Sequence, residues 1–243
     1  DNFRQPCLFI SSQGKPHCRS KRNPCYSFWF ITLKIEVTMA KVFVKQGEIS
    51  SSVTWLYKII TNNPIEVIKV DQTASNDNPL KIFPYLIDGE AQIWGDFTVI
   101  SHLAEKTGNK NSLCGDTSEE KSQINSLLFW LAGSFSRSAL RDYVFPKKDG
   151  ANICKLDLDS DNALLIEHGF KSTSSHLDNL EKSYFNVDNK KSLTSKQSIA
   201  DYYLALILLE LEKNQFKLDN WKNTNTWFKG FKPEVEKLLN QMV

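Results

Sequence analysis

The sequence lacks any long hydrophobic run. Its longest uninterrupted apolar stretch, residues 202–209, has eight residues, whereas a helix that spans a membrane needs about 20. The five cysteines form no Cys-x-x-Cys pair, and their number is odd. These absences argue against a membrane-spanning protein, a structural zinc site and a secreted disulfide scaffold, and no metal centre is expected.

A concentrated positive charge is missing from most of the chain. The formal net charge is +2, but residues 1–38 hold six of the 30 Lys and Arg residues and only two of the 28 Asp and Glu residues. The rest of the chain therefore carries a net charge of −2. Nucleic acids are bound through dense positive charge, so we expect no direct nucleic-acid binding by this part.

What is present is an ordinary globular composition. The 243 residues are 41% hydrophobic and 24% charged, which disfavours wholesale disorder. The length suits one large domain or two small ones, and the sequence shows no internal repeats.

Residues 1–38 differ from the rest of the chain. They precede the first methionine, Met39, and contain no acidic residue between Asp1 and Glu36. We interpret Met39 as the natural start and residues 1–38 as translated upstream sequence. An organelle transit peptide, which is also poor in acidic residues, is the alternative. Either interpretation predicts a leader that is not part of the fold.

Between residues 39 and 105, patterns of strand and helix alternate. Strands are predicted over residues 41–45, 65–70, 81–87 and 91–94, and helices over 50–61 and 96–105. The first strand, the first helix and the second strand read as a βαβ unit, which implies parallel strands. Asp88-Gly89 predicts a hairpin turn, and Asp96 is placed to cap the second helix.

After a predicted linker over residues 106–115, residues 116–243 show only the helical period. The most apolar segment, residues 202–211, follows Ser198 and Asp201. A serine followed three residues later by a carboxylate fits a capping box. We therefore expect this segment to be the buried central helix of an all-α domain, with structural roles for Ser198 and Asp201.

Two stretches of the sequence resemble the glutathione transferase superfamily. Residues 78–89, NPLKIFPYLIDG, are similar to the family segment NPxxKVPxLxDG, and residues 198–201, SIAD, are similar to its [ST]-[IL]-A-D motif. The resemblance covers about residues 39–243. It implies an α/β thioredoxin-like N-terminal domain over residues 39–105, followed by an all-α helical C-terminal domain over residues 116–243.

The resemblance also implies a glutathione site at Phe83, Pro84, Gly95 and Asp96. Phe83-Pro84 matches the cis-proline pair whose backbone binds the cysteinyl group of glutathione in active members. Gly95 and Asp96 stand where those members have an acidic residue and a serine that hold the γ-glutamyl end. Gly95 offers no side chain, and like charges disfavour a ligand carboxylate beside Asp96. We expect this site to be eroded, with no bound cofactor.

Ser50 lies nearest the catalytic serine of theta-like transferases. In that role it would hydrogen-bond to the glutathione thiolate and lower its pKa. The proline and arginine that usually follow are replaced by Ser52 and Thr54. The alternative interpretation is that Ser50–Ser52 simply begin a helix, and no catalytic residue is then present.

Residues 95–103 and 114–121 are similar to a translation-associated branch of the superfamily. This branch comprises elongation factor one epsilon and the transferase-like domains appended to aminoacyl-tRNA synthetases. The resemblance implies a cytoplasmic, non-catalytic module that docks to other transferase-like domains, in synthetases or elongation factor subunits. The candidate docking helices are residues 96–105 and 117–130. The alternative is a theta-like transferase that conjugates glutathione to electrophiles, and a homodimer is left open.

Overall fold

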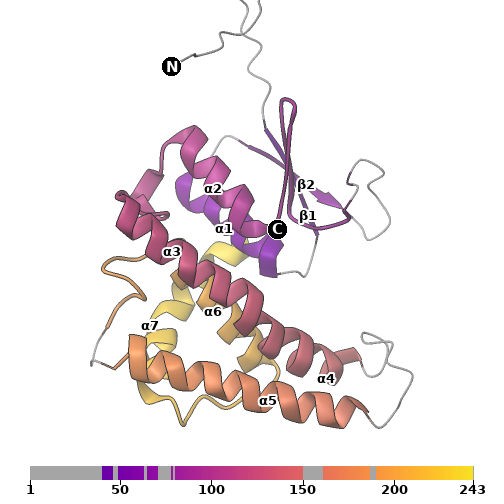
Figure 1. The fold of residues 1–243 in the computed structure, drawn as a ribbon, viewed down its shortest axis with the longest axis vertical. Coiled ribbons are helices and arrows are strands. Elements are labelled where there is room, and N and C mark those ends of the chain that lie inside the picture. Colours follow the sequence, from indigo (N-terminus) through magenta and orange to yellow (C-terminus); the bar gives the residue numbers. More distant parts are fainter. Residues whose placement is uncertain are drawn as a thin grey trace, which may run out of the picture. The chain divides into compact units, whose positions relative to one another are not determined.

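The computed structural model describes residues 40–45, 49–62, 65–70, 78, 80–149, 161–186 and 190–242. The predicted leader, residues 1–38, lies outside these ranges. Within the described residues, a part that contains strands precedes a part that is all helical (Figure 1).

The first part contains β1 (Lys41–Lys45), α1 (Ile49–Thr61), β2 (Glu66–Val70), β3 (Tyr85–Asp88), β4 (Ala91–Trp94) and α2 (Asp96–Thr107). The second part contains η1 (Lys110–Ser112), α3 (Ser118–Trp130), η2 (Leu131–Phe135), η3 (Arg137–Val144), α4 (Phe145–Asp149), α5 (Asp161–Asn179), η5 (Leu180–Tyr184), α6 (Ile199–Lys213), α7 (Lys222–Leu239) and η6 (Asn240–Met242). The segments η2, η3 and η5 are π-helical, and η2 and η3 continue α3 towards α4.

The four strands form one mixed sheet in the order β2-β1-β3-β4. β1 and β2 are parallel, with Val42 opposite Val67, as the βαβ pattern predicts. β3 runs antiparallel to β1, with Leu86 opposite Val42, and pairs with β4 across the predicted hairpin. Val42 and Leu86 are fully buried, as are Val53 and Leu56 of α1, so this helix supplies part of the core.

The third strand is shorter than the pattern predicts. It begins at Tyr85, whereas alternation suggests a start at residue 81. Lys81 has a φ of 52°, which is not a strand conformation, and Pro84 has no N–H for a ladder hydrogen bond. The residues before Tyr85 therefore form a loop in which Ile82 is about half exposed.

Helix α6 lies at the centre of the helical part. All its residues from Ile199 to Leu209 are buried, and it contacts α1, α3, α7 and η3. Its packing against α1 joins the two parts of the chain. It has 15 residues, and no helix in the described ranges is long and apolar enough to cross a membrane.

Hydrogen bonds to one buried carboxylate fix the start of α6. Asp201, which is 1% exposed, accepts the N–H of Ser198 at 2.8 Å and the Ser198 hydroxyl at 3.0 Å. Its other oxygen accepts the N–H of Leu193 at 2.7 Å. Burial raises the pKa of Asp201 to about 6, although these hydrogen bonds act to lower it. The carboxylate thus ties the preceding loop to the helix start.

Candidate functional site

The four positions of the expected glutathione site come together where β3 and α2 begin. The Phe83-Pro84 peptide bond is cis. The Gly95 N–H donates a hydrogen bond of 2.9 Å to the Pro84 carbonyl, which joins the proline loop to the start of α2. Asp96 follows as the first residue of that helix.

A buried asparagine holds the proline loop against the end of β4. Asn78 is 2% exposed, and its amide nitrogen donates to the Ile82 carbonyl at 2.9 Å. Its amide oxygen accepts the indole N–H of Trp94 at 2.8 Å. No sequence pattern indicated these contacts of Asn78 and Trp94. The only sequence feature that pointed to Asn78 is its position as the first residue of the family-like segment 78–89.

The helix cap differs from the prediction by one residue. The N-cap of α2 is Gly95, with a φ of 85° and a ψ of 145°, whereas the sequence pattern suggested Asp96. Gly95 suits this conformation because residues with a Cβ rarely adopt it. Asp96 lies in the first turn, where its carboxylate accepts the N–H of Phe97 at 2.8 Å. The predicted cap at Asp96 is therefore wrong.

Asp96 is also connected to the helical part of the chain. Only 9% of the surface of Asp96 is exposed to solvent. Burial of Tyr203 in α6, and then the negative charge of Asp96, raise the pKa of the Tyr203 hydroxyl well above its usual value. The Asp96 carboxylate thus interacts with Tyr203 as well as with Phe97. No local pattern in the sequence indicates this contact.

These interactions change what the start of α2 can bind. A helix N-terminus attracts anions because its first N–H groups lack partners in the helix. Here one of these groups, the N–H of Phe97, already donates to Asp96, which brings its own negative charge. A ligand carboxylate would therefore find one of these N–H groups already occupied and a like charge beside it.

The predicted catalytic position cannot be placed in the same way. Ser50 lies in the first turn of α1, but its side chain falls outside the described part of the chain. Its role in an active enzyme stays a prediction.

A pair of aromatic residues lies on the two expected docking helices. Phe97 on α2 and Phe129 on α3 meet edge to face, with ring centroids 5.4 Å apart. Phe129 is 69% exposed although it is large and apolar. The two helices are in contact (Figure 1), so the exposed ring of Phe129 lies beside the partly buried Phe97.

The histidine and cysteine side chains that the structure describes near these helices show no sign of a catalytic role. His102 on α2 lies 2.8 Å from a carboxylate oxygen of Asp88 in the hairpin, and Lys106 binds the other oxygen. Burial raises the pKa of the Cys114 thiol to about 12, so this thiol stays protonated and is a poor nucleophile. Among the described residues, no group of three or more His, Cys, Asp or Glu could hold a metal ion.

No protein-family model matches this sequence. Solved structures do resemble the chain. A diazinon-metabolizing glutathione S-transferase from the silkworm Bombyx mori is 20% identical, with a TM-score of 0.66 over 83% of this chain and 96% of that one. Human glutathione S-transferase T1-1 is 18% identical, with a TM-score of 0.67 over 83% and 87%.

Ure2p in complex with glutathione is a third similar structure. It is 16% identical, with a TM-score of 0.68 over 83% of this chain and 99% of that one. These likenesses agree with the strand order and the helical second part, and they confirm the expected fold class. The chain has the fold of the glutathione S-transferases, a thioredoxin-like domain followed by an all-helical domain.

Proposed function

We propose that this chain is a non-catalytic, glutathione transferase-like interaction module. In this proposal it is a cytoplasmic adaptor of the translation machinery, and it works without a cofactor. Its partners are other transferase-like domains, in aminoacyl-tRNA synthetases or elongation factor subunits. The partner class comes from the sequence resemblance of residues 95–103 and 114–121.

The observation that carries the proposal is the environment of Asp96. A glutathione carboxylate at the start of α2 would gain about 0.3–1 kcal/mol from the helix dipole. If it came within about 4 Å of the Asp96 carboxylate, repulsion would cost about 4 kcal/mol at an effective dielectric constant of about 20. At that separation the repulsion would exceed the attraction of the helix dipole. Gly95 adds no side chain that could compensate.

The exposed ring of Phe129, which packs against the partly buried Phe97, supports the proposed docking role. Aromatic side chains are enriched at the centres of protein interfaces, where their burial contributes much of the affinity. Phe97 and Phe129 stand on the two helices that the sequence resemblance implicates in docking. A transferase-like partner domain would cover the exposed ring of Phe129.

A binding experiment tests this surface. The full-length protein is titrated into purified transferase-like domains of synthetases and elongation factor subunits. We expect Phe129→Ser to weaken binding by about tenfold or more. Leu164→Ser is the matched control, because Leu164 is 65% exposed but lies on α5. Unchanged binding by Phe129→Ser, or an equal loss with both variants, would contradict the proposal.

A theta-like glutathione transferase is the second candidate function. The hydrogen bond from Gly95 to the Pro84 carbonyl favours it, because Phe83-Pro84 is the part of the site whose sequence matches active members. In this case glutathione would bind at Phe83, Pro84, Gly95 and Asp96, and Ser50 would stabilise its thiolate. A homodimer is compatible with either function.

A further inference from the structure

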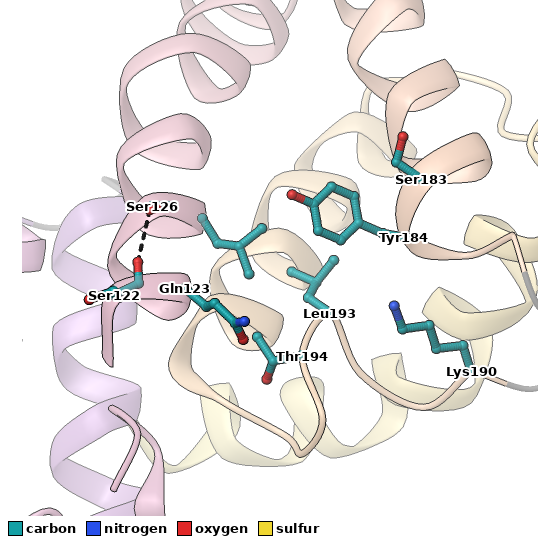
Figure 2. Close-up of a pocket in the computed structure, with 9 residues that line it drawn as sticks. Ser122, Gln123, Ser126, Ser183, Tyr184, Lys190, Leu193 and Thr194 are labelled. Carbon is teal, nitrogen blue, oxygen red and sulfur yellow. Dashed lines mark hydrogen bonds between the residues drawn. The ribbon is translucent and has the colours of Figure 1, made fainter. Parts of the chain in front are cut away.

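A pocket lies in the helical part of the chain, apart from the candidate glutathione site. It has a volume of about 480 Å³ and lies between α3, η5 and the loop that leads to α6 (Figure 2). This volume is within the range of about 300–1,000 Å³ that is typical of small-molecule sites. None of the four positions of the candidate glutathione site lines it.

Three hydroxyl groups in its wall can only accept further hydrogen bonds. The hydroxyls of Ser122 and Ser126 donate to carbonyls one turn earlier in α3, each at 2.8 Å. The Thr194 hydroxyl donates to the Lys196 carbonyl at 2.7 Å. A hydroxyl has one proton and two lone pairs, so these oxygens offer acceptors to a bound molecule. A ligand that matches them must carry several donors, as a polyol does.

Three further polar side chains line the pocket, Gln123 on α3 and Ser183 and Tyr184 on η5. The side chains of Gln123 and Ser183 and the hydroxyl of Tyr184 form no hydrogen bond with any residue that the structure describes. Figure 2 shows Gln123 and Tyr184 extending into the space between α3 and the loop. The Tyr184 ring stacks on Trp130, with centroids 6.4 Å apart, which holds its hydroxyl in place. These groups can both donate to ligand hydroxyls and accept from them.

The charge of the wall is positive. Lys190 lines the pocket, with its ammonium group 5.8 Å from the centroid of the Tyr184 ring. It forms no ion pair with a carboxylate in the described ranges, and none of the described lining residues is Asp or Glu. An anionic group on the ligand would therefore meet one cation and, among these residues, no carboxylate.

We infer that this pocket binds a small hydroxylated organic anion. The ligand's hydroxyls donate to Ser122, Ser126 and Thr194, and its phosphate or carboxylate group binds Lys190. This site is independent of the proposed docking surface.

Calorimetric titration of the full-length protein tests the inference with four probes: glucose 6-phosphate, gluconate, glucose and inorganic phosphate. We expect glucose 6-phosphate or gluconate to bind at least about tenfold more tightly than glucose or inorganic phosphate, because only they engage both the hydroxyls and Lys190. The stronger of the two identifies the anionic group. Failure of both hydroxylated anions to bind, or equal binding of inorganic phosphate, would overturn the inference.

Two lysine variants locate the binding. Lys190→Gln should weaken the hydroxylated anion about tenfold and leave glucose unchanged, since only the charged contact is lost. Lys191→Gln is the matched control, because it removes the same charge from the adjacent, exposed residue that does not line the pocket. Equal effects of the two substitutions would mean that general surface charge attracts the probe, and would overturn the site.

Discussion

The buried carboxylate of Asp201 allows a prediction about stability. Its burial disfavours the charged form, whereas its hydrogen bonds stabilise that form. Replacement by alanine removes the acceptor of two donors from Ser198 and one from Leu193. Each unpartnered buried donor costs about 1–3 kcal/mol. The variant also removes a buried charge, whose raised pKa of about 6, against 3.8, corresponds to about 3 kcal/mol at neutral pH. Three donors cost about 3–9 kcal/mol, of which removal of the buried charge offsets about 3, so we expect Asp201→Ala to lower the free energy of unfolding by up to about 6 kcal/mol.

The dependence on pH separates the two effects. A carboxyl whose pKa is raised by folding keeps its proton longer in the native state, so its contribution to stability is full below pH 3.8 and is lost as pH rises through about 6. Asp201→Asn does not titrate and keeps one acceptor oxygen. Between about pH 4.5 and 7.5, we expect wild type to lose about 2 kcal/mol of stability relative to Asp201→Asn.

Urea unfolding of wild type and Asp201→Asn at several pH values measures this difference. Carboxylates common to both proteins, such as Asp88, cancel in the comparison. A difference that stays constant with pH, or that shifts in favour of wild type as pH rises, would refute the reasoning. It would mean that the hydrogen bonds from Ser198 and Leu193 outweigh burial in setting the pKa of Asp201.

Two further predictions concern the start of helices. Glu181 accepts two backbone N–H groups and the buried Thr224 hydroxyl at the start of α7, so Glu181→Ala should cost about 2–4 kcal/mol in urea unfolding. The exposed neighbour variant Lys182→Ala should change stability little, and similar losses from both would contradict this role. Gly95→Ala should cost about 1–3 kcal/mol because its φ of 85° and ψ of 145° suit glycine almost exclusively. Gly133→Ala, at a helical position with open space around it, should be neutral or stabilising, and a larger loss there would refute the backbone argument.

The sequence predicted most of the fold because its signals are local. Strand β1 and strand β4 have the predicted bounds, and α1 begins one residue before its predicted start. Each of these elements has a clear apolar period and lies next to residues that favour turns or caps. The predicted third strand was too long because Pro84 and the positive φ of Lys81 interrupt a segment whose apolar residues still alternate.

The candidate site was predicted less completely, since its decisive contacts join distant segments. The family-like segment identified Phe83 and Pro84. The position of Asp96 indicated a negative charge where active members bind the ligand carboxylate. Its contact with Tyr203 depends on how α2 packs near α6, which no local pattern specifies. The exposure of Phe129 was not predicted either. Large apolar side chains are usually buried, and no sequence pattern singles out this one as exposed.

The most direct test of the central claim is a calorimetric titration of the full-length protein with glutathione up to millimolar concentration. Our account predicts no detectable heat of binding from protein that is shown to be folded by a cooperative thermal transition, because Asp96 repels the ligand carboxylate. Binding in the micromolar to low-millimolar range, lost in Ser50→Ala or Pro84→Ala, would contradict the account and favour the transferase alternative, which assays with electrophiles would then test.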